Sequence, residues 1–169
     1  MSIQGHAVVF TAPGQVEYRP VTCPAPRTGQ VAVRVTHSWI SNGTEGSYLR
    51  GERIAGDTAR RDGDPWPFPI VAGYQKVGVV EWVADDADDL QPGDVVFAVM
   101  GAVDGMFEPR GGHVSPSVTG RASVWKLPPG LDPVAYSGLV LTQVGYNCGA
   151  RAPVEIGDAA VVLGDGLVG

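Results

Sequence analysis

Cysteine is scarce in this 169-residue chain, which also has little positive charge and no long apolar run. Its two cysteines, Cys23 and Cys148, lie far apart in sequence, so a disulfide framework is not expected. Twelve Lys and Arg against eighteen Asp and Glu give a net charge of −6, which leaves no basic face for nucleic acid or anionic lipid. No apolar stretch approaches the ~18 residues of a membrane span, and the first six residues lack the features of a signal peptide. We therefore expect a cytoplasmic protein without nucleic-acid or membrane partners.

Glycine and proline are abundant, at 24 and 14 residues, and turns this dense exclude a helical bundle. Short segments between the turns alternate in hydrophobicity: Val31, Val33 and Val35 share one face, and Arg34 and Thr36 share the other. The strand candidates are 6–10, 16–19, 30–37, 70–83, 94–100 and 122–127, with bends expected at the glycines of 70–83. Two polar stretches, 51–69 and 85–89, are expected on the surface, and the first has room for a short helix. The pattern predicts a mainly β fold with a few helices.

The last part of the chain has a different pattern. Asp132 followed by Pro133 is typical of a helix start, and the helix should run to about residue 148. Five apolar residues at 159–163 indicate a strand buried on both faces, and Gly164-x-Gly166-x-x-Gly169 follows directly. In a dinucleotide-binding fold, such glycines allow a tight turn and a close approach of the backbone to a pyrophosphate. The alternative is an ordinary glycine-rich loop.

The order of motifs along the whole chain resembles the medium-chain dehydrogenase/reductase superfamily, the alcohol dehydrogenase-like proteins. The resemblance rests on Gly43-Thr44-Glu45, Gly73-Tyr74-Gln75, Pro92-Gly93-Asp94, Gly111-Gly112-His113, residues 127–131 and the glycine fingerprint. It implies a GroES-like catalytic domain at 1–150, built as a partly open barrel that binds the substrate. It also implies that 151–169 is the first β-strand and glycine-rich loop of a truncated Rossmann domain, and that the portion alone is inactive.

Zinc-dependent members of the superfamily carry Cys, His and Glu ligands at positions that this chain fills with other residues. By the resemblance, Ser41 lies near the position of the Cys, Tyr74 replaces the His and Gln75 replaces the Glu. Hydroxyls hold zinc poorly beside thiolate and imidazole, so no zinc is expected. The resemblance instead places Ser41, Thr44 and Tyr74 around the substrate oxygen, with Tyr74 as a candidate proton donor and Gln75 as a further catalytic candidate. Two alternatives stay open: Tyr74 as a core aromatic, and Thr44 as the cap of a helix.

The same resemblance implies NAD or NADP as cofactor. Thr142 matches a residue that approaches the nicotinamide, although it could simply bond its own helix backbone. The candidate phosphate-binding residues are Gly164, Gly166, Leu167, Val168 and Gly169. The expected activity is zinc-independent hydride transfer between a nicotinamide and a small carbonyl, alcohol or activated alkene, in a protein that could form a homodimer. The alternative is a non-catalytic GroES-like binding or assembly module. His113, in a glycine-rich loop, is expected to be structural or exposed.

Overall fold

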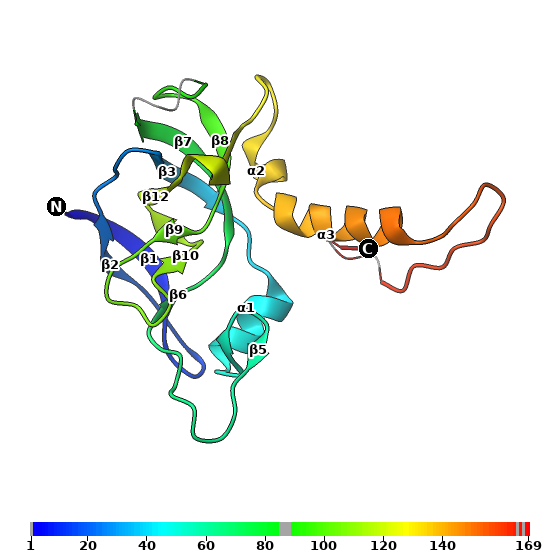
Figure 1. Ribbon diagram of the computed structural model, residues 1–169, viewed down its shortest axis with the longest axis horizontal. Helices are drawn as coiled ribbons and strands as arrows, with labels where there is room; N and C mark the ends of the chain where they lie inside the picture. Colours follow the sequence, from blue (N-terminus) through cyan, green and yellow to red (C-terminus); the bar gives the residue numbers. More distant parts are fainter. Residues whose placement is uncertain (1, 85–88, 165, 167) are drawn as a thin grey trace.

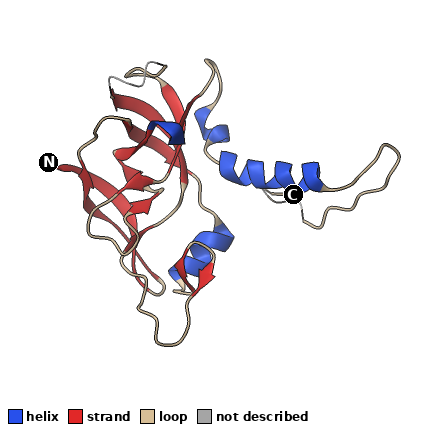
Figure 2. Ribbon diagram, in the orientation of Figure 1, coloured by secondary structure: helices blue, strands red, loops and turns tan. Residues whose placement is uncertain are grey.

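Figure 1 shows the computed structural model, which describes residues 2–84, 89–164, 166 and 168–169. The chain folds as a curled, partly open assembly of β-sheets from which one helix extends (Figure 2). The strands are β1 Ser2–Ala12, β2 Gln15–Pro24, β3 Gln30–Ser38, β4 Arg53–Ala55, β5 Thr58–Ala59, β6 Ile70–Val71, β7 Gln75–Val83, β8 Val95–Val99, β9 Gly101–Ala102, β10 Arg110–Gly111, β11 Val114–Ser115, β12 Ser117–Gly120 and β13 Val124–Lys126. The helices are α1 Asn42–Leu49, α2 Pro133–Tyr136 and α3 Leu139–Arg151, with one 3-10 turn at Arg121–Ser123. The mainly β fold class is confirmed.

The largest sheet is antiparallel, with the order β12-β3-β7-β8-β13. The predicted alternation of β3 holds in part, because Val31 and Val33 are fully buried but Ala32 is buried as well. Between Val35 and His37 the pairing of β3 with β7 shifts by one residue, opposite Gly78. A β-bulge of this kind bends a strand and increases its twist, which curls the sheet.

The second sheet has the order β11-β1-β2, with β6 also paired to β1. The predicted run 70–83 is divided into β6 and β7, because Gly73 between them has a φ of +78° that only glycine adopts readily. The polar stretch 51–69 forms no helix; it contains the small hairpin of β4 and β5. Buried valines and alanines of both sheets make the core, among them Ala7, Val9, Val80, Val96 and Ala98.

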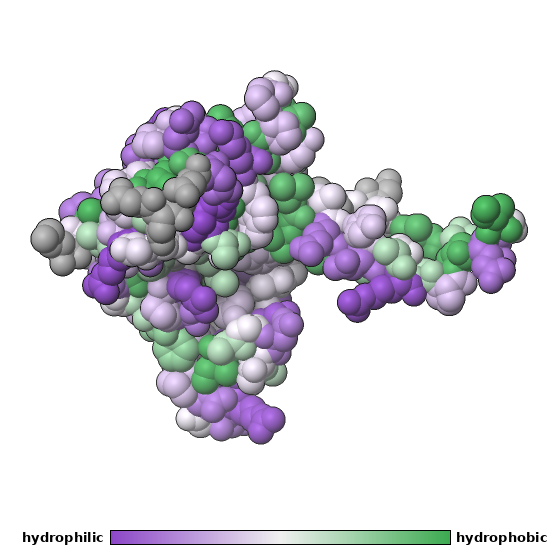
Figure 3. Space-filling model, turned by 45° about the horizontal axis from the view of Figure 1, so that its top comes forward, coloured by the Kyte–Doolittle hydropathy of each residue, from purple (hydrophilic) through white to green (hydrophobic). Residues whose placement is uncertain are grey.

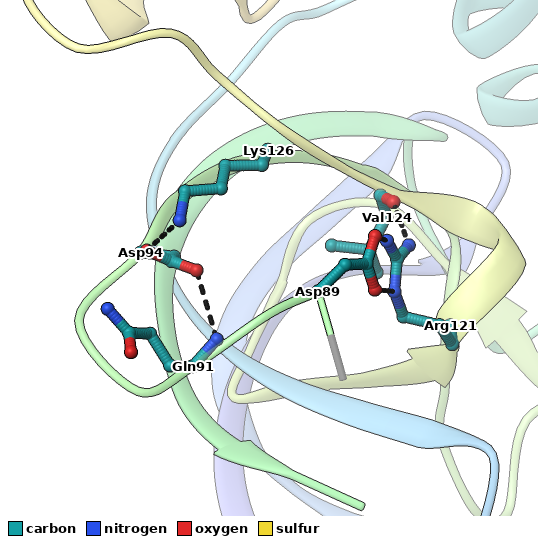
Figure 4. A network of polar contacts seen from close by, with 6 residues as sticks. All are labelled: Asp89, Gln91, Asp94, Arg121, Val124 and Lys126. Atoms are coloured by element: carbon teal, nitrogen blue, oxygen red, sulfur yellow. Dashed lines mark hydrogen bonds and ion pairs between the residues drawn. The ribbon is translucent and has the colours of Figure 1, made fainter. Parts of the chain in front are cut away.

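Two ion pairs lie at one end of the larger sheet (Figure 4). Lys126 on β13 lies 2.7 Å from a carboxylate oxygen of Asp94, whose other oxygen accepts a hydrogen bond from the backbone N–H of Gln91 at 2.9 Å. Arg121 pairs with Asp89 and also donates to the carbonyl of Val124 at 2.6 Å. The hydrogen bond from Lys126 is the main cause of a lowered pKa at Asp94. The rest of the predicted acidic loop, 85–88, lies outside the described residues.

The predicted helix 133–148 is two helices. Asp132 caps α2, since its side chain accepts from the N–H of Val134, and Pro133 occupies the first position as expected. The chain then breaks at Ser137 and Gly138 before α3 begins, and α3 has no buried residue. None of the helices among the described residues is long and apolar enough to cross a membrane.

The strand predicted at 159–163 is not formed, and this expectation was wrong. Residues 159–163 have no strand partner and leave large side chains in solvent, including Val161 at 84% and Leu163 at 94% exposure. Figure 3 shows hydrophobic side chains along this arm of the molecule. A strand requires a neighbour to satisfy its N–H and C=O groups, and the described residues supply none beside this segment. The segment folds back toward α3, where Val168 lies against Gly145.

Candidate active-site cleft

A cleft of about 260 Å³ lies beside α1. Most of its wall is apolar or aromatic, from Phe10, Tyr48, Ile70, Val71, Ala72 and Met100. Thr44, Glu45 and Tyr74 add polar groups, and Asp57, Glu108 and Arg110 also line it. A concave apolar site with a few polar groups is the usual form of a small-molecule site.

The N-terminus of α1 positions two of the predicted catalytic residues. Ser41 is its N-cap and is buried, although its hydroxyl makes no capping bond. Thr44 lies inside α1 and lines the cleft, so the alternative that Thr44 caps the helix was wrong. Ser41 does not line the cleft; it borders a second hollow beside it.

A buried carboxylate–imidazole pair lies behind Thr44. Glu45 accepts from the backbone N–H of Ser41 at 2.7 Å through Oε1, and its Oε2 lies 2.9 Å from Nε2 of His113. Both side chains are nearly inaccessible, at 7% and 6% exposure. The ring of His113 packs directly against Gly73, so tightly that any side chain there would overlap it. Sequence reasoning missed this pairing, because the two residues are 68 positions apart and only the fold joins them.

Tyr74 and Gln75 follow Gly73 in the sequence, but their side chains lie in different surroundings. Tyr74 is half-buried and lines the cleft, and its hydroxyl has no hydrogen-bond partner among the described residues. Gln75 is fully buried and does not reach the cleft. Its Oε1 accepts from the backbone N–H of Val140 at 3.0 Å, while Nε2 has no partner in the described part of the chain. The structure therefore brings Thr44 and Tyr74 together and sets Gln75 behind them as a link to α3.

Four of the predicted cofactor residues border the second hollow, which Ser41 also lines. A hollow of about 540 Å³ is lined by residues 39–43, Leu141 and the glycine-rich segment, including Gly164, Gly166, Val168 and Gly169. Gly164 has a φ of +101°, as a tight turn would require. Leu167 lies outside the described residues. Thr142 is exposed on α3 and contacts its own backbone at Gly138, so it is not placed in this hollow.

A second buried polar group lies close to the cleft. Lys76 is fully buried on β7, and its Nζ donates to the carbonyls of Gly111 and Gly112 at 3.3 and 3.1 Å. Burial lowers the pKa of Lys76 to about 7, because removing the ammonium from water disfavours the charged form. Burial likewise raises the pKa of the Cys23 thiol to about 11. Cys23 and Cys148 are both free; Cys23 is buried and Cys148 is exposed.

The donor set at the positions of the superfamily's zinc ligands suits zinc poorly. Ser41, Tyr74 and Gln75 offer a hydroxyl, a phenol and an amide, whereas Zn²⁺ is bound by thiolate, imidazole and carboxylate. Within the described ranges, no group of three or more His, Cys, Asp or Glu side chains could hold a metal ion.

Comparison with known proteins gives the following likenesses. No family model matches the chain. It is 32% identical over 94 residues to 2-desacetyl-2-hydroxyethyl bacteriochlorophyllide A dehydrogenase of Cereibacter sphaeroides, covering 54% of this chain and 26% of that protein. It is 29% identical over 140 residues to S-(hydroxymethyl)glutathione dehydrogenase of Escherichia coli, covering 80% and 35%. The chain thus spans about a third or less of these curated relatives.

Solved structures share the fold. An Escherichia coli oxidoreductase/dehydrogenase of unknown specificity superposes with a TM-score of 0.73 at 19% identity, covering 92% of this chain and 49% of that one. A putative zinc-binding dehydrogenase from Sinorhizobium meliloti bound to NADP gives 0.64 at 20% identity, covering 86% and 46%. In sequence and in fold the chain therefore resembles the medium-chain dehydrogenase/reductase proteins, as its motifs predicted, and its relatives are oxidoreductases.

Proposed function

We propose that this chain, with the sequence motifs and fold of medium-chain dehydrogenase/reductase proteins, is the substrate-binding portion of an NAD(P)-dependent oxidoreductase. The observation that carries the proposal is the meeting of Thr44 and Tyr74 on the wall of an apolar cleft. The hydroxyls of these two residues supply hydrogen bonds to a substrate oxygen, and the apolar wall excludes water from it. The substrate is a small carbonyl compound, an alcohol or an activated alkene.

The nicotinamide, when bound, supplies or accepts the hydride. Gly164 and Gly166 are the described residues that fit its pyrophosphate, because they border the hollow beside Ser41 and lack side chains that would block the backbone. The chain has no described helix after residue 151, so the helix N-terminus that normally completes such a site is not supplied by these residues. We therefore propose that the 169-residue chain alone does not turn over.

We further propose that the reaction is zinc-independent. At the ligand positions the chain offers Ser41, Tyr74 and Gln75, and Gln75 already accepts from Val140. Tyr74 has the free hydroxyl, and as proton donor it protonates the substrate oxygen during reduction. The cytoplasmic location and the homodimer of the whole protein stay predictions.

The test uses the protein with the rest of its dinucleotide-binding domain. Tyr74→Phe should lower kcat/KM by about 10²-fold, the lower end of the range for general acid–base catalysis. Tyr18→Phe is the matched control, since Tyr18 is 74% exposed on β2 and does not line the cleft. Added chelator should leave the rate unchanged.

Equal rates for the two tyrosine variants would contradict the role of Tyr74, and loss of activity with the chelator would contradict zinc independence. Absence of any turnover with NADH or NADPH would favour the binding-module alternative. Micromolar binding of either cofactor to the 169-residue chain, measured by calorimetry, would contradict its proposed incompetence.

A further inference from the structure

Lys76 is a buried lysine whose hydrogen bonds go to a glycine loop, residues 111–112, and not to a carboxylate. Its side chain is fully buried on β7, and its Nζ donates to the carbonyls of Gly111 and Gly112 at 3.3 and 3.1 Å. Among the residues that the structure describes it has no ion-pair partner. An ammonium carries three N–H donors and a neutral amine two, so both bonds persist in either state. An apolar side chain would fill the same space without the cost of burying an amine, so the property specific to lysine here is its donors.

The glycine loop lies directly against the backbone that carries Tyr74. The N–H groups of Gly112 and His113 both donate to the carbonyl of Ala72, at 3.0 and 2.8 Å. A Cβ added at Gly112 would lie 2.2 Å from the backbone N of Tyr74 and 2.3 Å from the carbonyl C of Gly73. These are backbone atoms, which cannot turn aside as the end of a flexible side chain can. A displacement of the loop is therefore transmitted to the backbone of Tyr74.

The other glycine of the loop is confined in the same way. A Cβ added at Gly111 would lie 2.4 Å from Cγ1 of Val71 and 2.6 Å from its carbonyl oxygen. The loop is thus pressed against residues 71–74, while its carbonyls accept from Lys76 two residues after Tyr74. A closed set of contacts results: the chain leads from Tyr74 to Lys76, the two hydrogen bonds lead to the loop, and the loop packs back on Tyr74.

The side chain of Tyr74 has no polar anchor of its own. It is half-buried on the cleft wall, and its hydroxyl has no hydrogen-bond partner in the described part of the chain. The neighbouring side chain of Gln75 differs, because its Oε1 is held by the N–H of Val140 at 3.0 Å. The place of the Tyr74 hydroxyl in the cleft therefore depends on how firmly its backbone is held.

We infer that Lys76 is a positioning residue for Tyr74: its two hydrogen bonds hold the loop 111–112 against the backbone of Tyr74 and so fix the place of that side chain on the cleft wall. Lys76 does not line the cleft and acts only through the loop. The inference rests on the proposed function, because it concerns the same proton donor. A misplacement of about 1 Å in a catalytic site can cost about 10²-fold in rate, so a small movement of the loop is enough to matter.

The first measurement needs no activity and uses hydrogen exchange in the 169-residue chain. Lys76→Met keeps an unbranched apolar side chain and removes both donors, so the amide protons of Gly112 and His113 should exchange at least about tenfold faster as the loop opens. The amide proton of Val80, bonded elsewhere on the same strand, should be unaffected. Lys126→Met is the matched control, because it makes the same change at a half-exposed lysine of β13, and it should leave the exchange of the loop unchanged.

The second measurement uses the protein with the rest of its dinucleotide-binding domain. Lys76→Met should lower kcat about tenfold and change KM less than about twofold, because a misplaced donor weakens the transition state more than substrate binding. Lys126→Met should leave both constants within about twofold. In the Tyr74→Phe background, Lys76→Met should cost less than about twofold, because no hydroxyl remains to be positioned. A role in stability alone would give the same loss in both backgrounds.

If Lys76→Met does not fold, Lys76→Gln replaces it, since it keeps an amide donor but withdraws it by one bond; the same pattern with smaller losses is expected. Three results would overturn the inference: unchanged exchange of the loop amides in the folded variant, unchanged kcat where Tyr74→Phe lowers it, or equal losses in the two backgrounds. The proposed function fails separately, by absence of turnover in the whole protein. Faster exchange of the loop without turnover would support the hold of Lys76 on the loop and contradict the enzyme.

Discussion

Replacing Gly73 tests the contact between Gly73 and the His113 ring, which holds the ring beside Glu45. Its φ of +78° is unfavourable for any residue with a side chain, and a Cβ added there would lie 2.5 Å from two ring atoms of His113. Gly14, in the turn between β1 and β2, has a similar φ of +72° with nothing within 4 Å of an added Cβ. The two glycines therefore differ in surroundings while sharing a conformation.

The expected losses of stability follow from that difference. Gly14→Ala should cost about 1 kcal/mol, the cost of a left-handed conformation alone. Gly73→Ala should cost about 3 kcal/mol, because overpacking against the imidazole adds about 2 kcal/mol. The displaced ring would also lose its 2.9 Å contact with Glu45.

Urea unfolding followed by tryptophan fluorescence measures both variants, with unchanged m-values required for the comparison. The ring resonances of His113 should shift in Gly73→Ala and stay in place in Gly14→Ala. Equal losses of stability in the two variants would refute the reasoning, since they would show that the His113 ring yields to a methyl group without cost.

Three further predictions concern buried or paired titratable groups. Because burial lowers the pKa of Lys76 from 10.5 in the unfolded chain to about 7 in the fold, the unfolded state binds more protons above pH 7, and stability should rise with pH from about 7 to 9. Above pH 9 the raised pKa of the Cys23 thiol opposes this rise. Lys76→Met should abolish the rise between pH 7 and 9 in urea midpoints. Asp94→Asn should destabilise the protein by about 1 kcal/mol at pH 7 through loss of the Lys126 interaction. This deficit should vanish in acid, because the lowered pKa of Asp94 provides stability that is present above its unfolded pKa and lost as the pH falls through the folded pKa. Iodoacetamide is added at about pH 7.5, roughly one unit below an ordinary thiol pKa. It should alkylate the exposed Cys148 quickly and the buried Cys23 only on unfolding. Rapid labelling of both thiols would contradict the burial of Cys23.

The features predictable from the sequence are those whose cause is local. Gly73 broke its strand as expected, because the glycine itself permits the backbone conformation of the break. Asp132 and Pro133 began a helix for the same kind of reason, since the cap reaches a backbone N–H two residues away. The break inside that helix was missed, although Ser137-Gly138 is a dipeptide that often marks a turn.

The errors and omissions have causes distant in sequence. A run of apolar residues at 159–163 becomes a strand only beside a partner, and the described chain provides none there. His113 had an ordinary local interpretation as a loop histidine, and Glu45 was noted only as part of the Gly43-Thr44-Glu45 motif. The pairing of β1 with β11, the bond from the Val8 N–H to the carbonyl of His113 and the bond from the His113 N–H to the carbonyl of Ala72 hold the imidazole where it meets Glu45.

The bond between Gln75 and Val140 has a mechanical consequence. It fastens the first turn of α3 to β7, where Leu139 and Val140 also pack against the core near Val77, while the rest of the helix has no buried residue. A 13-residue helix is about 20 Å long, so a rotation of about 5° at its first turn carries its far end through about 2 Å. We therefore expect a change at the Gln75 amide to displace the end of α3 that leads to the glycine-rich segment more than it displaces the first turn.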